Sequence, residues 1–135
     1  MNQVSEFLRE NLYDGFTAAL PGGEEGRLSA SLDETEEALA ACLRAADKKV
    51  QSKGRWSYQG STAVVCVLHT EGGSGGVEEK TTVLSANVGD SRAVLSRDGE
   101  AIDLTTDHKP NDPREKVRMG RVKEKGSSSR GICAN

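Results

Sequence analysis

The chain has 135 residues, of which 35% are hydrophobic and 4% aromatic, and its formal net charge is −3. This length suffices for one domain with a small core, and counting glycine brings the apolar share near the globular average, so disorder of the whole chain is not expected. No apolar run approaches the ~20 residues that span a bilayer, and the first residues lack the basic and apolar segments of a secretion signal. We therefore expect a cytoplasmic or nuclear protein that has no membrane partner.

The charge is distributed unevenly. Residues 114–135 contain seven Lys/Arg and two Asp/Glu, a net of +5, which leaves −8 for residues 1–113. A basic segment can attract nucleic acid, but no aromatic side chain lies among these charges to stack on bases. We therefore predict no nucleic-acid partner, a domain over residues 1–118 and a divergent, disordered basic tail over residues 119–135.

The three cysteines are widely spaced and form no C-x-x-C motif. This pattern supports neither a zinc site nor a disulfide framework, and it fits a reducing compartment. Cys42 and Cys66 fall inside a predicted helix and a predicted strand, so we expect both to be packed like small hydrophobic residues.

The first predicted element is an amphipathic helix over residues 3–13. Val4, Phe7, Leu8 and Leu12 recur at the spacing of one helix face. Asp14 and Gly15 are predicted to end this helix, and the glycine-rich segment 21–26 to form a polar loop.

The second predicted helix covers residues 32–52. Ser31 and Glu34 have the spacing of a capping box, in which each side chain bonds the other residue's backbone amide. Acidic residues occupy the first turns, and Lys48 and Lys49 lie near the end, as the helix dipole favours. We interpret these carboxylates as dipole partners and not as catalytic acids.

Strands are expected within residues 56–104. The segment from Ala63 to His69 is apolar on both faces, which predicts a strand covered on both sides. Residues 71–79 are rich in glycine without the Lys-Ser/Thr of a phosphate-binding loop, and they predict a hairpin loop. Ser61 lacks the context of a nucleophile elbow and is interpreted as structural. His69 has no metal-ligand partner in sequence, so we expect a surface or capping group.

Two turn signals follow. Gly89, Asp90 and Ser91 separate the apolar runs 83–88 and 93–95, which predicts a hairpin with Gly89 at positive φ and the other two residues bonding local backbone. Asp98-Gly99 predicts a second hairpin turn. The predicted fold class is α+β with antiparallel sheets.

Three segments resemble the metal-dependent protein serine/threonine phosphatases of the PP2C (PPM) family. They are Gly60–Ala63, Ala86–Leu95 and Leu104–Pro110, in the family's order and spacing, and the two helices also agree in position. The resemblance covers roughly residues 4–118. It implies part of a β-sandwich of two antiparallel sheets flanked by helices.

The resemblance also implies a chemistry. In the family, Mn²⁺ or Mg²⁺ ions held by aspartates activate a bridging water that attacks phosphoserine or phosphothreonine in phosphoprotein substrates. Carboxylates suit this role because hard divalent cations take oxygen ligands.

Most of the family's metal ligands have no match in this chain. The D-G-H-G-G motif and two later aspartate motifs are missing, and Asp14-Gly15-Phe16 lacks the histidine that would make it a substitute. Asp107 alone matches a family ligand, that of a third metal site, and it remains open whether it keeps a metal contact or only stabilises the turn before Pro110. Asp90 and Arg92 are interpreted as a structural turn and partner pair, and His108 receives no catalytic role.

Two hypotheses follow. The chain is a fragment or truncated form of a PP2C-type phosphatase and is inactive alone, or it is a catalytically dead PP2C-like interaction protein. In either case half a sandwich exposes sheet edges, which predicts aggregation or strand pairing with another chain.

Overall fold

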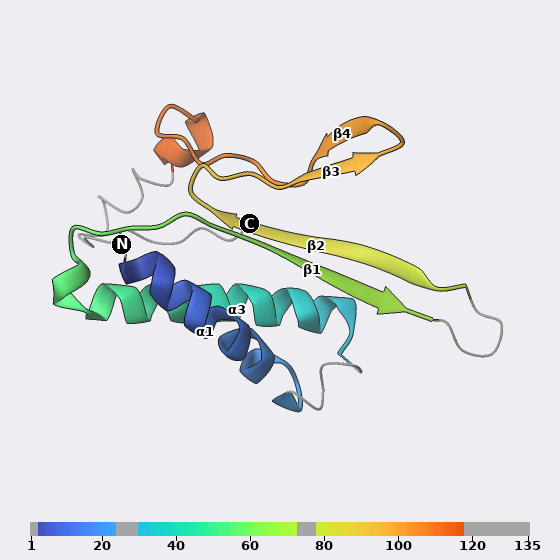
Figure 1. The fold of residues 1–135 in the computed structure, drawn as a ribbon, viewed down its shortest axis with the longest axis horizontal. Coiled ribbons are helices and arrows are strands. Elements are labelled where there is room, and N and C mark those ends of the chain that lie inside the picture. The colour runs from blue at the N-terminus through green and yellow to red at the C-terminus, as the bar shows by residue number, and fades with distance from the viewer. Residues whose placement is uncertain (1–2, 24–29, 73–77, 118–135) are drawn as a thin grey trace.

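The computed structural model describes residues 3–23, 30–72 and 78–117. Figure 1 shows three layers: two helices, a long two-stranded sheet above them, and a short hairpin above that sheet. The elements are α1 (Gln3–Ala19), α3 (Leu32–Ser52), the 3₁₀ turn η1 (Gly54–Trp56), β1 (Ala63–Glu71), β2 (Lys80–Val88), β3 (Val94–Arg97) and β4 (Glu100–Asp103). The tail predicted over residues 119–135 lies outside the described residues.

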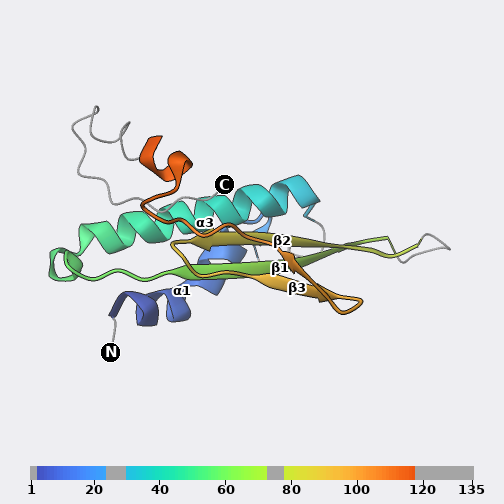
Figure 2. The same ribbon diagram turned by 90° about the horizontal axis from the view of Figure 1, so that it is seen from above.

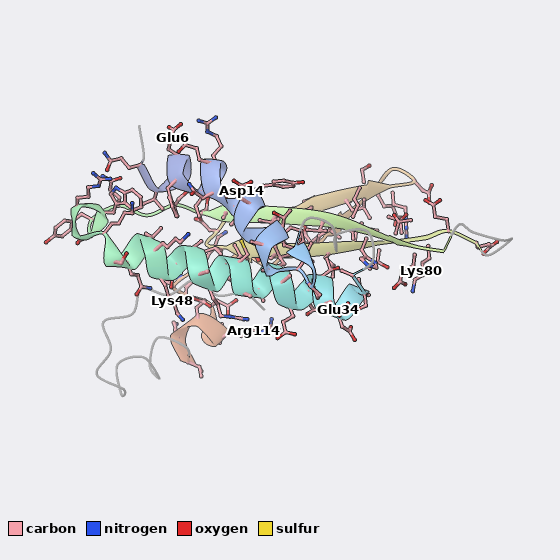
Figure 3. All side chains as sticks on the ribbon, turned by 90° about the horizontal axis from the view of Figure 1, so that it is seen from below. Glu6, Asp14, Glu34, Lys48, Lys80 and Arg114 are labelled. Atoms are coloured by element: carbon pink, nitrogen blue, oxygen red, sulfur yellow. The ribbon has the colours of Figure 1, made fainter. Side chains whose placement is uncertain are left out.

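Helix α3 has the bounds that the capping pattern predicts. The Ser31 Oγ accepts from the Glu34 amide at 3.3 Å, and the Ser31 amide donates to Glu34 Oε2 at 2.8 Å. The bond from the Ser31 amide, and a second bond that the Ser31 hydroxyl donates to Oε2 at 2.9 Å, lower the pKa of the Glu34 carboxyl. Figure 3 shows Glu34 near one end of α3 and Lys48 toward the other, as the helix dipole favours.

Helix α1 is longer than predicted. Asp14 and Gly15 do not end it, since the helix continues to Ala19. A Cβ on Gly15 would lie 3.2 Å from Cys42 Sγ, so this glycine allows α1 to approach α3 closely. Thr17 is buried in the extra turn, and this tertiary packing offsets the low helix propensity of glycine.

The hydrophobic core lies between the helices and the start of β1. Val4, Leu8, Ala46 and Trp56 are buried together, with Ala63 packed against them. The indole Nε1 of Trp56 donates to the side-chain oxygen of Gln3 at 2.6 Å, which satisfies the polar atom of this ring.

Strands β1 and β2 pair antiparallel over their full lengths, with Glu71 opposite Lys80. This confirms the hairpin predicted around residues 71–79. One face of this sheet carries Val64, Cys66 and Leu68 of β1 and their partners on β2, which are Asn87, Ser85 and Val83. We call it the outer face because it lies away from the helices.

The outer face is only partly covered, so the prediction that β1 is buried on both sides is wrong. Cys66 is exposed and Leu68 is 71% exposed, whereas Cys42 is buried as predicted. The β3–β4 layer is bonded to the outer face through Ser85 and Asn87, near the end of β2, and this leaves the Leu68 end open.

The hairpin predicted around Asp98-Gly99 is confirmed, and the hairpin predicted around Gly89 is wrong. β3 and β4 pair antiparallel around Asp98 and Gly99, whose φ angles are 53° and 83°. β2 and β3, however, belong to different sheets. The chain after Gly89 crosses to the other layer (Figure 1), and in the view from above the β3–β4 hairpin overlaps the long sheet (Figure 2).

The described chain is therefore α+β, with two antiparallel sheets in separate layers and the long helices α1 and α3 on one side, as in part of a PP2C-like sandwich. None of the described helices combines the length and the apolar character needed to cross a bilayer.

Candidate functional site

The crossing between β2 and β3 is the point where two motif segments meet. Gly89 has a φ of 88°, as predicted, and a Cβ there would lie 2.7 Å from Thr62 Cγ2. The Ser91 hydroxyl donates to the Thr62 hydroxyl at 2.7 Å, so Ser91 bonds a distant side chain and not local backbone. Gly89 is therefore needed both for its backbone angle and for close packing.

The third motif segment is bonded to the same turn. Asn87, which is only 7% exposed, donates through Nδ2 to the carbonyl oxygens of Thr106 at 2.9 Å and Gly89 at 3.2 Å. The His108 amide donates to the Gly89 carbonyl at 2.9 Å. These bonds fix the stretch that follows β4 against the end of β2, which places the residues of all three motifs next to one another.

An ion-pair cluster covers this junction. Arg92 donates from Nε to Asp107 Oδ1 at 2.9 Å and from Nη2 to Oδ2 at 3.2 Å, a two-pronged contact. Lys109 Nζ lies 3.0 Å from Asp107 Oδ2, and Arg92 Nη1 lies 3.3 Å from Asp103 Oδ2. The Asp107 side chain is 12% exposed, compared with 47% for Arg92.

The cluster perturbs the ionisation of its members. Hydrogen bonds from Arg92, and then from Lys109, lower the pKa of Asp107 to about 2. The same contact with Asp107, aided by Asp103, raises the pKa of Arg92. Asp107 is therefore an anion at physiological pH, and both its oxygens are already engaged by cations.

A polar cavity of about 270 Å³ lies beside the cluster. It is lined by residues of β2, by the ion pairs and by the stretch after β4: Ser85, Ala86, Asn87, Arg92, Asp103, Leu104, Thr105, Thr106 and Asp107. The cavity can accept a small polar group, because backbone and hydroxyl groups surround a guanidinium that is itself neutralised by two carboxylates.

A divalent metal ion does not fit the acidic residues that the structure describes. No group of three or more Asp, Glu, His or Cys side chains gathers at one point among them. Asp107 is held by two cations, and one carboxylate cannot replace the several oxygen ligands that Mg²⁺ or Mn²⁺ takes. The metal role of Asp107 stays a prediction.

The prediction that Arg92 pairs with Asp90 is wrong. The carboxylate partners of Arg92 are Asp103 and Asp107. Asp90 is exposed, and no described residue bonds its carboxylate. Sequence reasoning missed Asp103 and Asn87, because no local pattern marks a residue whose partner lies more than ten positions away.

Ser61 and His69 have structural contacts. The Ser61 hydroxyl donates to the carbonyl of Thr62 at 2.9 Å, which fits its structural interpretation. The Nε2 of His69 lies 2.8 Å from the carbonyl oxygen of Ala30, so this side chain links the end of β1 to the residue before the α3 cap.

The sequence matches known proteins over most of its length. Residues 2–130 match the family model of Protein phosphatase 2C. A relative from Oryza sativa subsp. japonica, "Probable protein phosphatase 2C 62", is 31% identical over 115 residues, which are 84% of this chain and 34% of that protein.

Two further relatives match more closely over shorter stretches. "Putative protein phosphatase 2C 22" from Oryza sativa subsp. japonica is 52% identical over 66 residues, 49% of this chain and 10% of its own length. "Protein phosphatase 2C 3" from Arabidopsis thaliana is 46% identical over 67 residues, 50% of this chain and 12% of its own length. The chain thus spans about a third or less of these relatives. Together with the three motifs around Gly89, the family match shows that the chain belongs to the protein phosphatase 2C family.

Proposed function

We propose that this chain is part of a protein serine/threonine phosphatase domain that hydrolyses phosphoserine and phosphothreonine in phosphoprotein substrates. The observation that carries the proposal is the convergence of three separated motif segments at one turn, through the Thr62–Ser91 and Gly89–His108 hydrogen bonds. The match of residues 2–130 to the Protein phosphatase 2C family supports the same reading.

The chemistry requires metal ligands beyond those described here. Bound Mn²⁺ or Mg²⁺ would supply a Lewis acid that activates water for attack on the phosphoryl group. Because the described acidic residues do not form a cluster that fits such an ion, we propose that the ligands lie outside the described residues. The part of the site described here acts as a support beside the catalytic centre.

Within that support, each polar residue has a positioning role. Arg92 and Lys109 neutralise Asp107 and hold the stretch after β4, while Asn87 bonds the backbone on both sides of the junction. This arrangement leaves the Asp90 carboxylate exposed at the turn. A rigid support of this kind keeps a neighbouring catalytic group within the narrow geometry that catalysis needs.

The direct test is hydrolysis of a phosphothreonine peptide by residues 1–135 with Mn²⁺, compared with the same reaction containing a chelator. We expect no metal-dependent release of phosphate. A complete protein phosphatase 2C serves as the positive control, and Asp107→Asn is the matched variant. Turnover that requires metal would contradict the proposed inactivity, and its loss in Asp107→Asn would show that this turnover depends on the Asp107 carboxylate.

The second candidate is a catalytically dead interaction protein. It is favoured by the ion pairs of Asp107 with Arg92 and Lys109, because both oxygens of this carboxylate are then engaged by cations. A polar cavity that could take part in binding lies beside them. It predicts that the purified chain binds a phosphorylated peptide more tightly than the unphosphorylated one, without releasing phosphate. Equal binding of the two peptides in calorimetry would exclude this candidate. A cytoplasmic or nuclear location and the lack of a nucleic-acid partner stay predictions.

A further inference from the structure

The position of Lys109 in the ion-pair cluster follows from its neighbours in sequence. It precedes Pro110, and the residue before a proline favours extended backbone. In an extended segment, side chains two positions apart lie on the same side. Lys109 Nζ accordingly lies 3.0 Å from Asp107 Oδ2, while the amide of His108 between them is bonded to the Gly89 carbonyl. The order Asp-His-Lys-Pro therefore builds a short-range ion pair into this segment.

This contact completes the hydrogen bonding of one Asp107 oxygen. Oδ2 accepts from Lys109 Nζ and, at 3.2 Å, from Arg92 Nη2, so both of its lone pairs are used. Oδ1 accepts from Arg92 Nε at 2.9 Å. Because only 12% of the Asp107 side chain is exposed, little of the carboxylate surface remains for another cation.

The cluster is also balanced in charge. Two carboxylates, on Asp103 and Asp107, face two cations, on Arg92 and Lys109. The two cations are held differently in the described part of the chain, because Arg92 bonds both carboxylates and Lys109 bonds one. The Lys109 side chain is also 54% exposed. Lys109 is therefore the cation that can be exchanged while Arg92 keeps the carboxylate in place.

We propose that Lys109 is a resident counter-cation that occupies, on Asp107, a position that a divalent ion would otherwise take. The inference rests on the proposed function, in which Mn²⁺ or Mg²⁺ binds with ligands outside the described residues. Lys109 keeps Asp107 in place before an ion arrives, and it opposes binding of an ion to this carboxylate alone. A positive charge within about 4 Å of a divalent ion lowers the affinity by about tenfold, even at the dielectric constant of water.

Addition of Mn²⁺ alone to isotope-labelled residues 1–135 tests the proposal by NMR. A bound Mn²⁺ ion broadens the signals of nearby amides, and the amide of His108 reports on binding to Asp107. We expect Lys109→Met to show the broadening of the wild type at about one tenth of the Mn²⁺ concentration. Lys109→Arg keeps a cation at this position and should behave as the wild type. Asp107→Asn in the Lys109→Met background should remove the gain.

Lys80→Met is the control matched in charge. Lys80 begins β2, whereas the junction lies past the other end of this strand, at Val88. The control should therefore leave the broadening at His108 unchanged. Equal broadening in the wild type and Lys109→Met would overturn the proposal, and so would an equal gain in Lys80→Met or in Lys109→Arg. The measurement involves neither substrate nor turnover, so its failure would leave the proposed function untouched.

Discussion

The helical pair and the β3–β4 hairpin are held in place by different forces. α3 buries six residues along one face, among them Leu43 at 1% exposure. β3 and β4 contain no buried residue, and the hairpin is joined to the rest of the chain by hydrogen bonds and ion pairs near Gly89 and Arg92. The helices should therefore govern global stability, while the motif junction should respond to local geometry and to pH.

The comparison predicts the largest loss of stability in the helical pair. Leu43→Ala removes a fully buried side chain and leaves a cavity, so we expect the free energy of unfolding to fall by about 2–5 kcal/mol. Urea unfolding followed by circular dichroism measures this change. Tyr58→Ala is the control, because Tyr58 is 97% exposed and should cost little. A loss below that of Tyr58→Ala would mean that the helices do not form the stabilising core.

The next largest effect is expected at the crossing between the sheets. Gly89→Ala forces a side chain into positive φ and against Thr62, so we expect a loss of about 2 kcal/mol or more. Gly99→Ala separates the two causes, since Gly99 also has positive φ but meets no atom within 4 Å. The Gly99 variant should lose about 1 kcal/mol. Equal losses in urea unfolding would show that contact with Thr62 contributes nothing.

The smallest effect should be local and dependent on pH. The pKa of Asp107 is lowered to about 2, so its contribution to stability is present above the unfolded value near 3.9 and is lost as pH falls toward 2. Arg92→Gln removes the main cause of the shift. We expect the pKa of Asp107 to rise in an NMR titration, and the His108 amide to exchange faster.

Arg97→Gln provides the charge-matched control for that titration. Arg97 ends β3 and forms none of the ion pairs of the junction. Its replacement should leave the pKa of Asp107 where it is. A rise equal to that in Arg92→Gln would mean that net charge, and not the two-pronged contact, lowers the pKa.

Some features of this chain could be predicted because they depend on neighbours in sequence. The capping box at Ser31, the bounds of α3 and the positive φ of Gly89 and Gly99 follow from hydrogen bonds and steric limits within a few residues. The family motifs could be recognised for the same reason, since each is a short contiguous segment.

Other features depend on residues that are distant in sequence. The separation of β3 from the sheet of β1 and β2, the extension of α1 past Gly15 and the exposure of Cys66 all result from which surfaces the assembled layers cover. The partners of Arg92 lie 11 and 15 positions away, so a pattern of nearby residues cannot select them. Short-range steric limits and capping hydrogen bonds act within a few residues, so they are present before the chain is compact. Strand partners and long-range ion pairs depend on which distant segments the folded chain brings together, so they are decided only by the tertiary structure.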